Sequence, residues 1–427
     1  MSSFASVVAF ACGGGGSPPG RLPAGGEETA ALSGPVLPAR EPLIRVGIAL
    51  GDSALPVSGP GRWRIGEADP ARPVAVVDGG PPWTIVKLPF ENLLRVRRPD
   101  GYVSQPHAGP LKVEPIGPGT LRVGGAPYAG SIEFQLRPDG TLTAVNLVPL
   151  EAYLEGVVSR ELGHPDRAAF EAQRAQAVAA RTYALKRLGS RADLGFDVYG
   201  SVLDQAYGGI PDPADSLAVE AVRSTRGQAL LYAGHLIDAY YHSTCGGSTA
   251  RVELVFDDPP APYLVPVSDR RPDGSYWCQG SRYFRWTTTL DGAELQATMD
   301  RNLPALVPLP PEGVGRVEDV RLERSTPEGR ALSVRVITSS GRYLVSENAI
   351  RSLFADTEGR LLRSTQFLFR PVHRSGVLEQ VTLLGGGWGH GVGMCQVGAL
   401  ERARQGQDHR RILSTYYPGT EVVALYP

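Results

Sequence analysis

A glutamate on the apolar face of a predicted helix is the first residue whose position suits acid–base chemistry. The segment 150–162, "LEAYLEGVVSREL", has the 3.6-residue periodicity of an amphipathic helix. At about 100° per residue, Glu161 continues the apolar stripe that begins at Leu150. Burial disfavours a charged carboxylate, so we expect a raised pKa for Glu161, as a general acid near neutral pH requires. The alternative is a helix-end glutamate that turns to water or pairs with Arg160 or Arg181.

Two further glutamates of the same segment fall outside the apolar stripe. Glu151 and Glu155 lie about 100° and 140° from it, so we expect both side chains to be solvated. Glu151 is also in the first turn, where a carboxylate interacts favourably with the helix dipole. Neither glutamate is therefore predicted to be catalytic.

A loop at 196–211, "FDVYGSVLDQAYGGIP", combines polar and aromatic side chains with glycines. Asp204, Gln205 and Tyr207 give it a composition that is common in sugar-binding loops and equally common in ordinary loops. Glycoside hydrolysis usually needs two carboxylates. Asp197 or Asp204 could be the second one, but the sequence does not fix the distance of either to Glu161.

The segment "YYHSTCGGST" places His242 three residues before Cys245. This spacing is half of a metal site, and no second close pair of ligands completes it, so we predict no metal. A Cys245 nucleophile is conceivable, but an exported thiol usually oxidises. If Cys12 is lipidated, three cysteines are left for at most one disulfide. We predict Cys245–Cys278, with Cys395 packed at the start of a helix.

Seven glycines surround one tryptophan and one histidine at 385–399, "GGGWGHGVGMCQVGA". A phosphate-binding loop is excluded because no Lys-Ser/Thr pair follows. Glycine serves where φ is positive or where another group approaches the backbone closely. The stretch therefore predicts either a tight loop that presents Trp388 and His390 to a sugar, or a turn that packs against a neighbouring segment.

The order of strands and helices predicts an α+β fold. Short β-branched runs separated by Gly/Pro turns indicate an antiparallel β-rich part over 41–149. The segment 150–427 is expected to form the catalytic core, in which the helices 150–162 and 167–188 are inserted between β regions. Further on, the sequence predicts a meander of three strands over 317–346 and a last helix after the glycine-rich stretch. No internal repeat is present.

Composition and the N-terminus indicate an exported protein. The formal net charge of -1 gives no electrostatic basis for nucleic-acid binding. No run of about 18 apolar residues predicts a membrane-spanning helix. Residues 1–40 resemble the end of a lipoprotein signal peptide, with Cys12 as the lipidation site, followed by a Gly/Pro linker; the alternative is a disordered N-terminus. The membrane is thus expected as a partner only through this anchor.

Six motifs in series resemble the stage II sporulation protein D family, also called the amidase enhancer family. The resemblance spans about 41–427. The chain departs from the family where the glutamate is followed by Leu162-Gly163-His164-Pro165 instead of Met-Pro. The motifs are "VNLVPLEAYLEGVVSRELG", "AQAVAARTYAL", "SVLDQAYGG", "YYHSTCGGST", "GWGHGVGMCQVGA" and "ILSTYYPGT".

The resemblance implies a peptidoglycan lytic transglycosylase that leaves 1,6-anhydro ends, with Glu161 as the catalytic acid and base. It implies no cofactor. Some relatives bind zinc through His and Cys, but the further close pair of ligands is missing here. The expected partners are glycan strands and a cell-wall amidase. The second choice of function is a glycan-binding enhancer without turnover, and the third is a metal or thiol hydrolase. The residues assigned to substrate binding are Gln176, Arg181, Tyr183, Asp204, Gln205, Tyr207, His242, Ser243, Trp388, His390 and Gln396.

Overall fold

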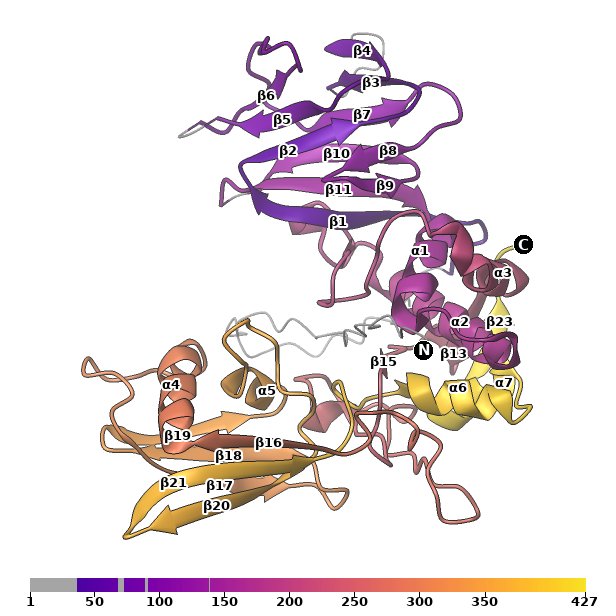
Figure 1. The fold of residues 1–427 in the computed structure, drawn as a ribbon. Coiled ribbons are helices and arrows are strands. Elements are labelled where there is room, and N and C mark those ends of the chain that lie inside the picture. The colour runs from indigo at the N-terminus through magenta and orange to yellow at the C-terminus, as the bar shows by residue number, and fades with distance from the viewer. Residues whose placement is uncertain (1–36, 68–72, 89–90, 138) are drawn as a thin grey trace, which may run out of the picture. The chain divides into compact units, whose positions relative to one another are not determined.

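The computed structural model describes residues 37–67, 73–88, 91–137 and 139–427. These residues form two compact units (Figure 1). The first unit contains the described residues up to Ala239 together with Glu421–Pro427, and the second contains Tyr240–Thr420. The predicted signal and linker over 1–40, with the lipidation site at Cys12, falls outside the described residues except for 37–40.

The first unit begins with two sheets that are almost entirely antiparallel. A seven-stranded sheet has the order β12-β1-β11-β10-β7-β3-β4, and a five-stranded sheet has the order β6-β5-β2-β8-β9. The sheets contact one another through an edge-on pair of rings, Trp63 and Trp83. The strands are β1 (Leu43–Asp52), β2 (Ala54–Ser58), β3 (Arg62–Gly66), β4 (Ala75–Asp78), β5 (Trp83–Lys87), β6 (Leu94–Arg97), β7 (Leu111–Pro115), β8 (Leu121–Val123), β9 (Ala126–Tyr128), β10 (Ser131–Leu136), β11 (Leu142–Pro149) and β12 (Val198–Tyr199).

Three helices complete the first unit: α1 (Leu150–Leu162), α2 (Phe170–Arg187) and α3 (Ser216–Ser224). Helix α1 starts directly after β11 and ends at Leu162, before Gly163, which has a φ of 64°. The predicted helix over 150–162 is confirmed. The second predicted helix begins with a 3-10 turn and is α-helical from Phe170. Beside α2 lies a sheet of β14 (His235–Leu236), β13 (Gln228–Tyr232) and the C-terminal β23 (Glu421–Ala424).

The second unit contains two three-stranded antiparallel sheets, β16-β21-β20 and β17-β18-β19, and a short parallel pair, β15-β22. The predicted meander over 317–346 is confirmed as β17-β18-β19. The elements are β15 (Tyr241–His242), β16 (Trp286–Asp291), α4 (Gly292–Asn302), β17 (Val317–Ser325), β18 (Ala331–Thr338), β19 (Gly341–Ser346), α5 (Ala349–Leu353), β20 (Phe367–Arg374), β21 (Val377–Gly385), β22 (Met394–Cys395), α6 (Gln396–Arg404) and α7 (His409–Tyr416).

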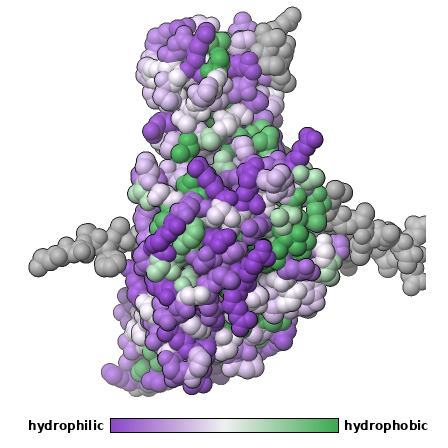
Figure 2. Space-filling view, turned by 90° about the vertical axis from the view of Figure 1, so that its right-hand side faces the viewer, coloured by the Kyte–Doolittle hydropathy of each residue, from purple (hydrophilic) through white to green (hydrophobic). Residues whose placement is uncertain are grey.

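The fold class is α+β, as the order of elements predicts. The β-rich part and the first helices belong to one compact unit, because α1 continues from β11 and packs against β1 and β11. On the face shown in Figure 2, hydrophilic side chains prevail and apolar ones form small separate groups. Among the described residues, no helix is long and apolar enough to cross a bilayer.

Candidate functional site

Glu161 lies in the last turn of α1 and points into the first unit, with 3% of its surface exposed. Its Oε1 accepts a hydrogen bond from the backbone N–H of Ala206 at 2.9 Å. The prediction that this glutamate faces inward is confirmed, and the side chain does not turn to water. The backbone of the loop at Ala206 therefore holds one oxygen of this carboxyl group in place.

The loop that supplies this N–H is anchored by Asp204 and Gln205, which are both fully buried. Asp204 accepts from the hydroxyl of Tyr183 at 2.6 Å, and Gln205 accepts from the hydroxyl of Tyr153 at 3.0 Å. Asp204, Gln205 and Tyr183 are predicted to bind substrate. In the structure these side chains bind groups inside the first unit, which corrects the expectation of a sugar-facing loop, and they hold the loop that carries Ala206 against Glu161.

Tyr207 completes the anchor of the same loop. Its hydroxyl donates to the buried Asn146 Oδ1 at 2.8 Å, and its ring packs on Tyr153 with centroids 4.9 Å apart. At Gly156 of α1, a Cβ would collide with the carbonyl oxygen of Gly209. The absence of a side chain at Gly156 therefore allows the loop to lie directly against α1.

We expect Gly156→Ala to lower the free energy of unfolding by about 2 kcal/mol. Overpacking against a rigid carbonyl costs up to about 3 kcal/mol, and the better helix propensity of alanine returns only about 1 kcal/mol. Urea denaturation followed by circular dichroism measures the difference. Gly61→Ala is the matched control, since an added methyl group there meets nothing within 4 Å. Equal stability of the two variants would contradict the close packing of the loop on α1.

Both candidates for a second carboxylate are bound by groups of the first unit. Asp197 accepts from the backbone N–H of Arg45 at 2.8 Å and of Gly189 at 2.7 Å. Asp204 is occupied by Tyr183, as described above, and by Arg191 at 3.1 Å. Asp197 and Asp204 thus have structural partners, and the role of Glu161 as the acid stays a prediction.

Arg181, predicted to bind substrate, is fully buried in an ion pair with Glu151. Arg181 Nε and Nη2 donate to the two carboxylate oxygens at 2.8 and 2.6 Å, and the Tyr426 hydroxyl donates to Oε1 at 2.7 Å. The prediction that Glu151 is solvated is wrong, since α2 and α3 enclose α1 and leave Glu151 7% exposed. Gln176, another predicted substrate ligand, is also fully buried.

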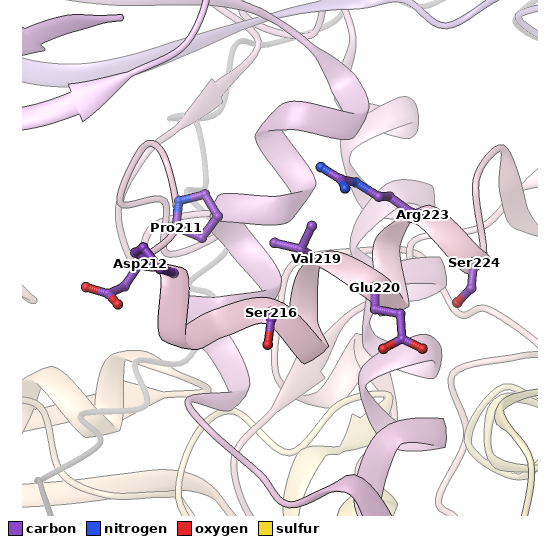
Figure 3. Close-up of a pocket in the computed structure, with 8 residues that line it drawn as sticks. Pro211, Asp212, Ser216, Val219, Glu220, Arg223 and Ser224 are labelled. Carbon is purple, nitrogen blue, oxygen red and sulfur yellow. The ribbon is translucent and has the colours of Figure 1, made fainter.

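A surface hollow lies along α3 (Figure 3). None of the predicted site residues lines it. Its lining includes Pro211, Asp212, Ser216, Val219, Glu220 and Arg223.

In the second unit, both histidines predicted to bind substrate are buried and neutral. His390 Nε2 donates to the carbonyl of Tyr241 at 2.8 Å, while its Nδ1 accepts from the N–H of Val392 at 3.1 Å. His242 Nδ1 donates to the carbonyl of Val392 at 3.1 Å. Burial lowers the pKa of His390 far below its usual value and lowers the pKa of His242 to about 3. Both imidazoles therefore join chain segments here, which corrects their assignment to a sugar-binding surface.

The glycine-rich stretch packs closely against the segment that contains Thr244. Trp388 and Thr244 exchange backbone hydrogen bonds of 2.8 and 3.0 Å, and a Cβ at Gly387 would lie 2.6 Å from the Thr244 carbonyl oxygen. These contacts favour the second of the two predicted roles of the glycine-rich stretch, a turn that packs against a neighbouring segment. Trp388 itself is partly exposed and contacts the ring of Tyr283 edge-on. The remaining predicted ligands, Ser243 and Gln396, are 7% and 3% exposed.

Three free cysteines, Cys245, Cys278 and Cys395, meet Asp269 in the interior of the second unit. The Sγ atoms of Cys245 and Cys278 are 3.5 Å apart, whereas a disulfide requires about 2.05 Å. The predicted disulfide is therefore not formed in this structure, because a third thiol and a carboxylate share the space. The sequence interpretation missed Asp269 and set Cys395 apart. The signal available was the odd number of cysteines that is left once Cys12 is assigned to lipidation.

Comparisons with known proteins identify two matching families. The family described as Stage II sporulation protein matches residues 138–232, and a domain of unknown function (DUF8618) matches 274–393. The first match covers α1, α2 and the loop that anchors Glu161.

Three relatives extend the similarity over most of the chain. Stage II sporulation protein D of Bacillus amyloliquefaciens is 31% identical over 295 residues, which are 65% of this chain and 75% of that protein. An uncharacterized protein of Brachyspira hyodysenteriae is 30% identical over 302 residues, 70% of this chain and 73% of that protein. The amidase enhancer of Bacillus subtilis is 28% identical over 294 residues, 64% of this chain but only 40% of that protein. With 31% identity across three quarters of a named member, and with a family match that contains the helix of Glu161, the chain belongs to the stage II sporulation protein D family.

Proposed function

We propose that the protein is an exported lytic transglycosylase that cleaves peptidoglycan glycan strands between N-acetylmuramic acid and N-acetylglucosamine. The observation that carries the proposal is the fixed, inward-facing carboxyl group of Glu161, held by the N–H of Ala206 in the part of the chain matched by the family. A lipid anchor at Cys12 would keep the enzyme at the cell envelope. Trp388, which is partly exposed, is our candidate in the second unit for stacking on a sugar ring.

A single carboxyl group suffices for this reaction. The neutral Glu161 donates its proton to the glycosidic oxygen as the bond from that oxygen to C1 breaks. The resulting carboxylate accepts the proton of the sugar's 6-hydroxyl as O6 bonds to C1, so that Glu161 returns to its neutral form and no water is consumed. The 6-hydroxyl belongs to the same sugar, which gives it a high effective concentration at C1.

We expect the full chain, incubated with purified sacculi, to release fragments with 1,6-anhydro ends. Mass spectrometry separates these from free reducing ends, which are heavier by one water. Reducing ends alone would show a hydrolase, for which a second carboxylate must activate water. Such a result would overturn the mechanism even if Glu161 proved essential.

The second candidate function is a glycan-binding enhancer of a cell-wall amidase, without turnover. It is favoured by the similarity to the relative named amidase enhancer. If the purified chain binds sacculi but cleaves neither intact peptidoglycan nor glycan strands stripped of their peptides, the enhancer function replaces the enzymatic one. An amidase assay with and without the chain then measures the enhancement.

A further inference from the structure

We propose that Cys245, Asp269, Cys278 and Cys395 bind one zinc ion in a closed, structural site of the second unit. One ligand atom from each residue lies within 4.8 Å of the others, and all four side chains are fully buried. The site is distinct from Glu161, and its test does not depend on glycan cleavage.

The spacing of the four ligand atoms is that of a tetrahedral zinc site. Two thiolates bound to one zinc at about 2.3 Å are about 3.8 Å apart, and a thiolate and a carboxylate oxygen are about 3.5 Å apart. Cys245 Sγ lies 3.5 Å from Cys278 Sγ and 3.6 Å from Asp269 Oδ2. One ion therefore fits among these atoms with only small shifts of the side chains.

Three separate chain segments bring the ligands together. The parallel pairing of β15 with β22 aligns His242 with Cys395, and Cys245 follows three residues later. The backbone N–H of Cys245 donates to Cys395 Sγ at 3.2 Å. The remaining two ligands come from a turn in which the N–H of Trp277 donates to the carbonyl of Asp269 at 2.9 Å.

Groups next to the four ligands form hydrogen bonds that orient the ligand atoms toward one another. Asp269 Oδ1 accepts from the Tyr416 hydroxyl at 2.8 Å and from Arg402 at 3.3 Å, so that Oδ2 faces the cysteines. The N–H of Gly398 donates to Cys395 Sγ at 3.4 Å. A Cβ at Gly398 would lie 2.7 Å from Asp269 Oδ2, so glycine at this position makes room for the carboxylate. Such outer partners fix the orientation of metal ligands.

Charge is also balanced when zinc is present. Three thiolates, one carboxylate and Zn²⁺ carry a net charge of about -2, and two buried arginines adjoin the cluster. Arg402 binds Asp269, and Arg330 donates to the carbonyl of Cys245 at 3.0 Å. Arg330 is 2% exposed, and its Nε and Nη1 have no hydrogen-bond partner among the residues that the structure describes. A buried cation with two unpaired donors needs negative charge nearby, and an anionic zinc–thiolate centre supplies it.

Three thiolates and one carboxylate favour zinc over the other common metals. Thiolates disfavour magnesium and calcium, which take oxygen ligands. An iron–sulfur cluster needs room for several iron and sulfide atoms between its cysteines, whereas these ligand atoms surround the space of one ion. With four protein ligands and no open position, the ion would stabilise the fold and not catalyse a reaction.

The test is the zinc content of the full chain, purified with a reductant and without chelator. We expect one zinc per chain by mass spectrometry of the native protein, and a lower Tm after the zinc is removed by a chelator. Cys395→Ser and Asp269→Asn should bind zinc more than about 100-fold more weakly, while Arg402→Gln, which alters an outer partner, should lose about 10–100-fold. Asp273→Asn is the control, because Asp273 is an exposed carboxylate of the segment that joins Asp269 to Cys278 and is not one of the four ligands.

Two results would overturn the proposal. One is a wild-type chain without stoichiometric zinc in which two of the three thiols of the cluster are unreactive after denaturation, as in a disulfide. The other is zinc retained equally by Cys395→Ser, Asp269→Asn and the control. If these variants do not fold, Co²⁺ substitution of the unaltered chain decides: intense thiolate charge-transfer and tetrahedral bands support the site, and a weak octahedral spectrum rejects it.

Discussion

Glu161→Gln is expected to lower the rate of glycan cleavage by about 10²–10⁴-fold, the usual contribution of a general acid or base. The amide has the same size as the carboxyl group but cannot donate a proton to the departing oxygen or accept one from the 6-hydroxyl. Its oxygen can still accept the hydrogen bond from Ala206 N–H, so the loop should keep its position. Release of soluble fragments from sacculi measures the rate.

Glu155→Gln is the control for this variant, because it removes a carboxylate from the same helix without touching the site. Glu155 is partly exposed and pairs with Arg223, whose side chain is 72% exposed, so its loss should leave cleavage and stability nearly unchanged. Both variants should bind sacculi like the wild type. Undiminished cleavage by Glu161→Gln would show that another group is the acid.

The second large effect is expected at the ion pair between Glu151 and Arg181. Glu151→Gln leaves the guanidinium of Arg181 fully buried without a negative partner, which should cost about 3–5 kcal/mol of stability at neutral pH. Urea denaturation of the full chain measures this loss. Replacing both residues, as Glu151→Leu with Arg181→Met, should recover most of it, because apolar side chains of similar size do not leave a buried charge unpaired. A double variant as unstable as Glu151→Gln would contradict this explanation.

The pH dependence of this difference has a defined sign. Burial opposes the charged form of Glu151, but the hydrogen bond and charge of Arg181 outweigh it and lower the pKa below its usual 4.5. A carboxyl group whose pKa is lower in the folded state stabilises the fold above its unfolded pKa, and this contribution is lost as the pH falls through the folded value. The advantage of the wild type over Glu151→Gln should therefore be constant above about pH 5 and shrink at lower pH. An advantage that grows on acidification would refute the assignment.

Local signals were sufficient to predict the elements that carry the site. Helix α1 begins after Pro149 and ends before Gly163, and both residues act through their own backbone conformation. The apolar stripe also placed Glu161 on the buried side. The meander over 317–346 was predictable because its turns join neighbours in the sequence.

The same helix shows where the prediction from periodicity fails. A helical wheel assumes one buried face and one solvated face. Helix α1 is instead packed against α2, α3 and β11, and ten of its thirteen residues are buried. Glu151 is consequently buried and forms an ion pair with Arg181, which lies thirty residues away in the sequence.

The fold class, the helix of Glu161 and the inward direction of this side chain could be predicted, because they follow from the order of segments and from the spacing of side chains within one of them. The roles of the polar residues depend instead on the packing of distant segments. Asp204 and Gln205 anchor a loop, and His390 is buried between chain segments. Cys395 contacts Cys245, although the two lie 150 residues apart in the sequence. Contacts at such separations depend on how the sheets and helices pack, and no local pattern of residue types records them.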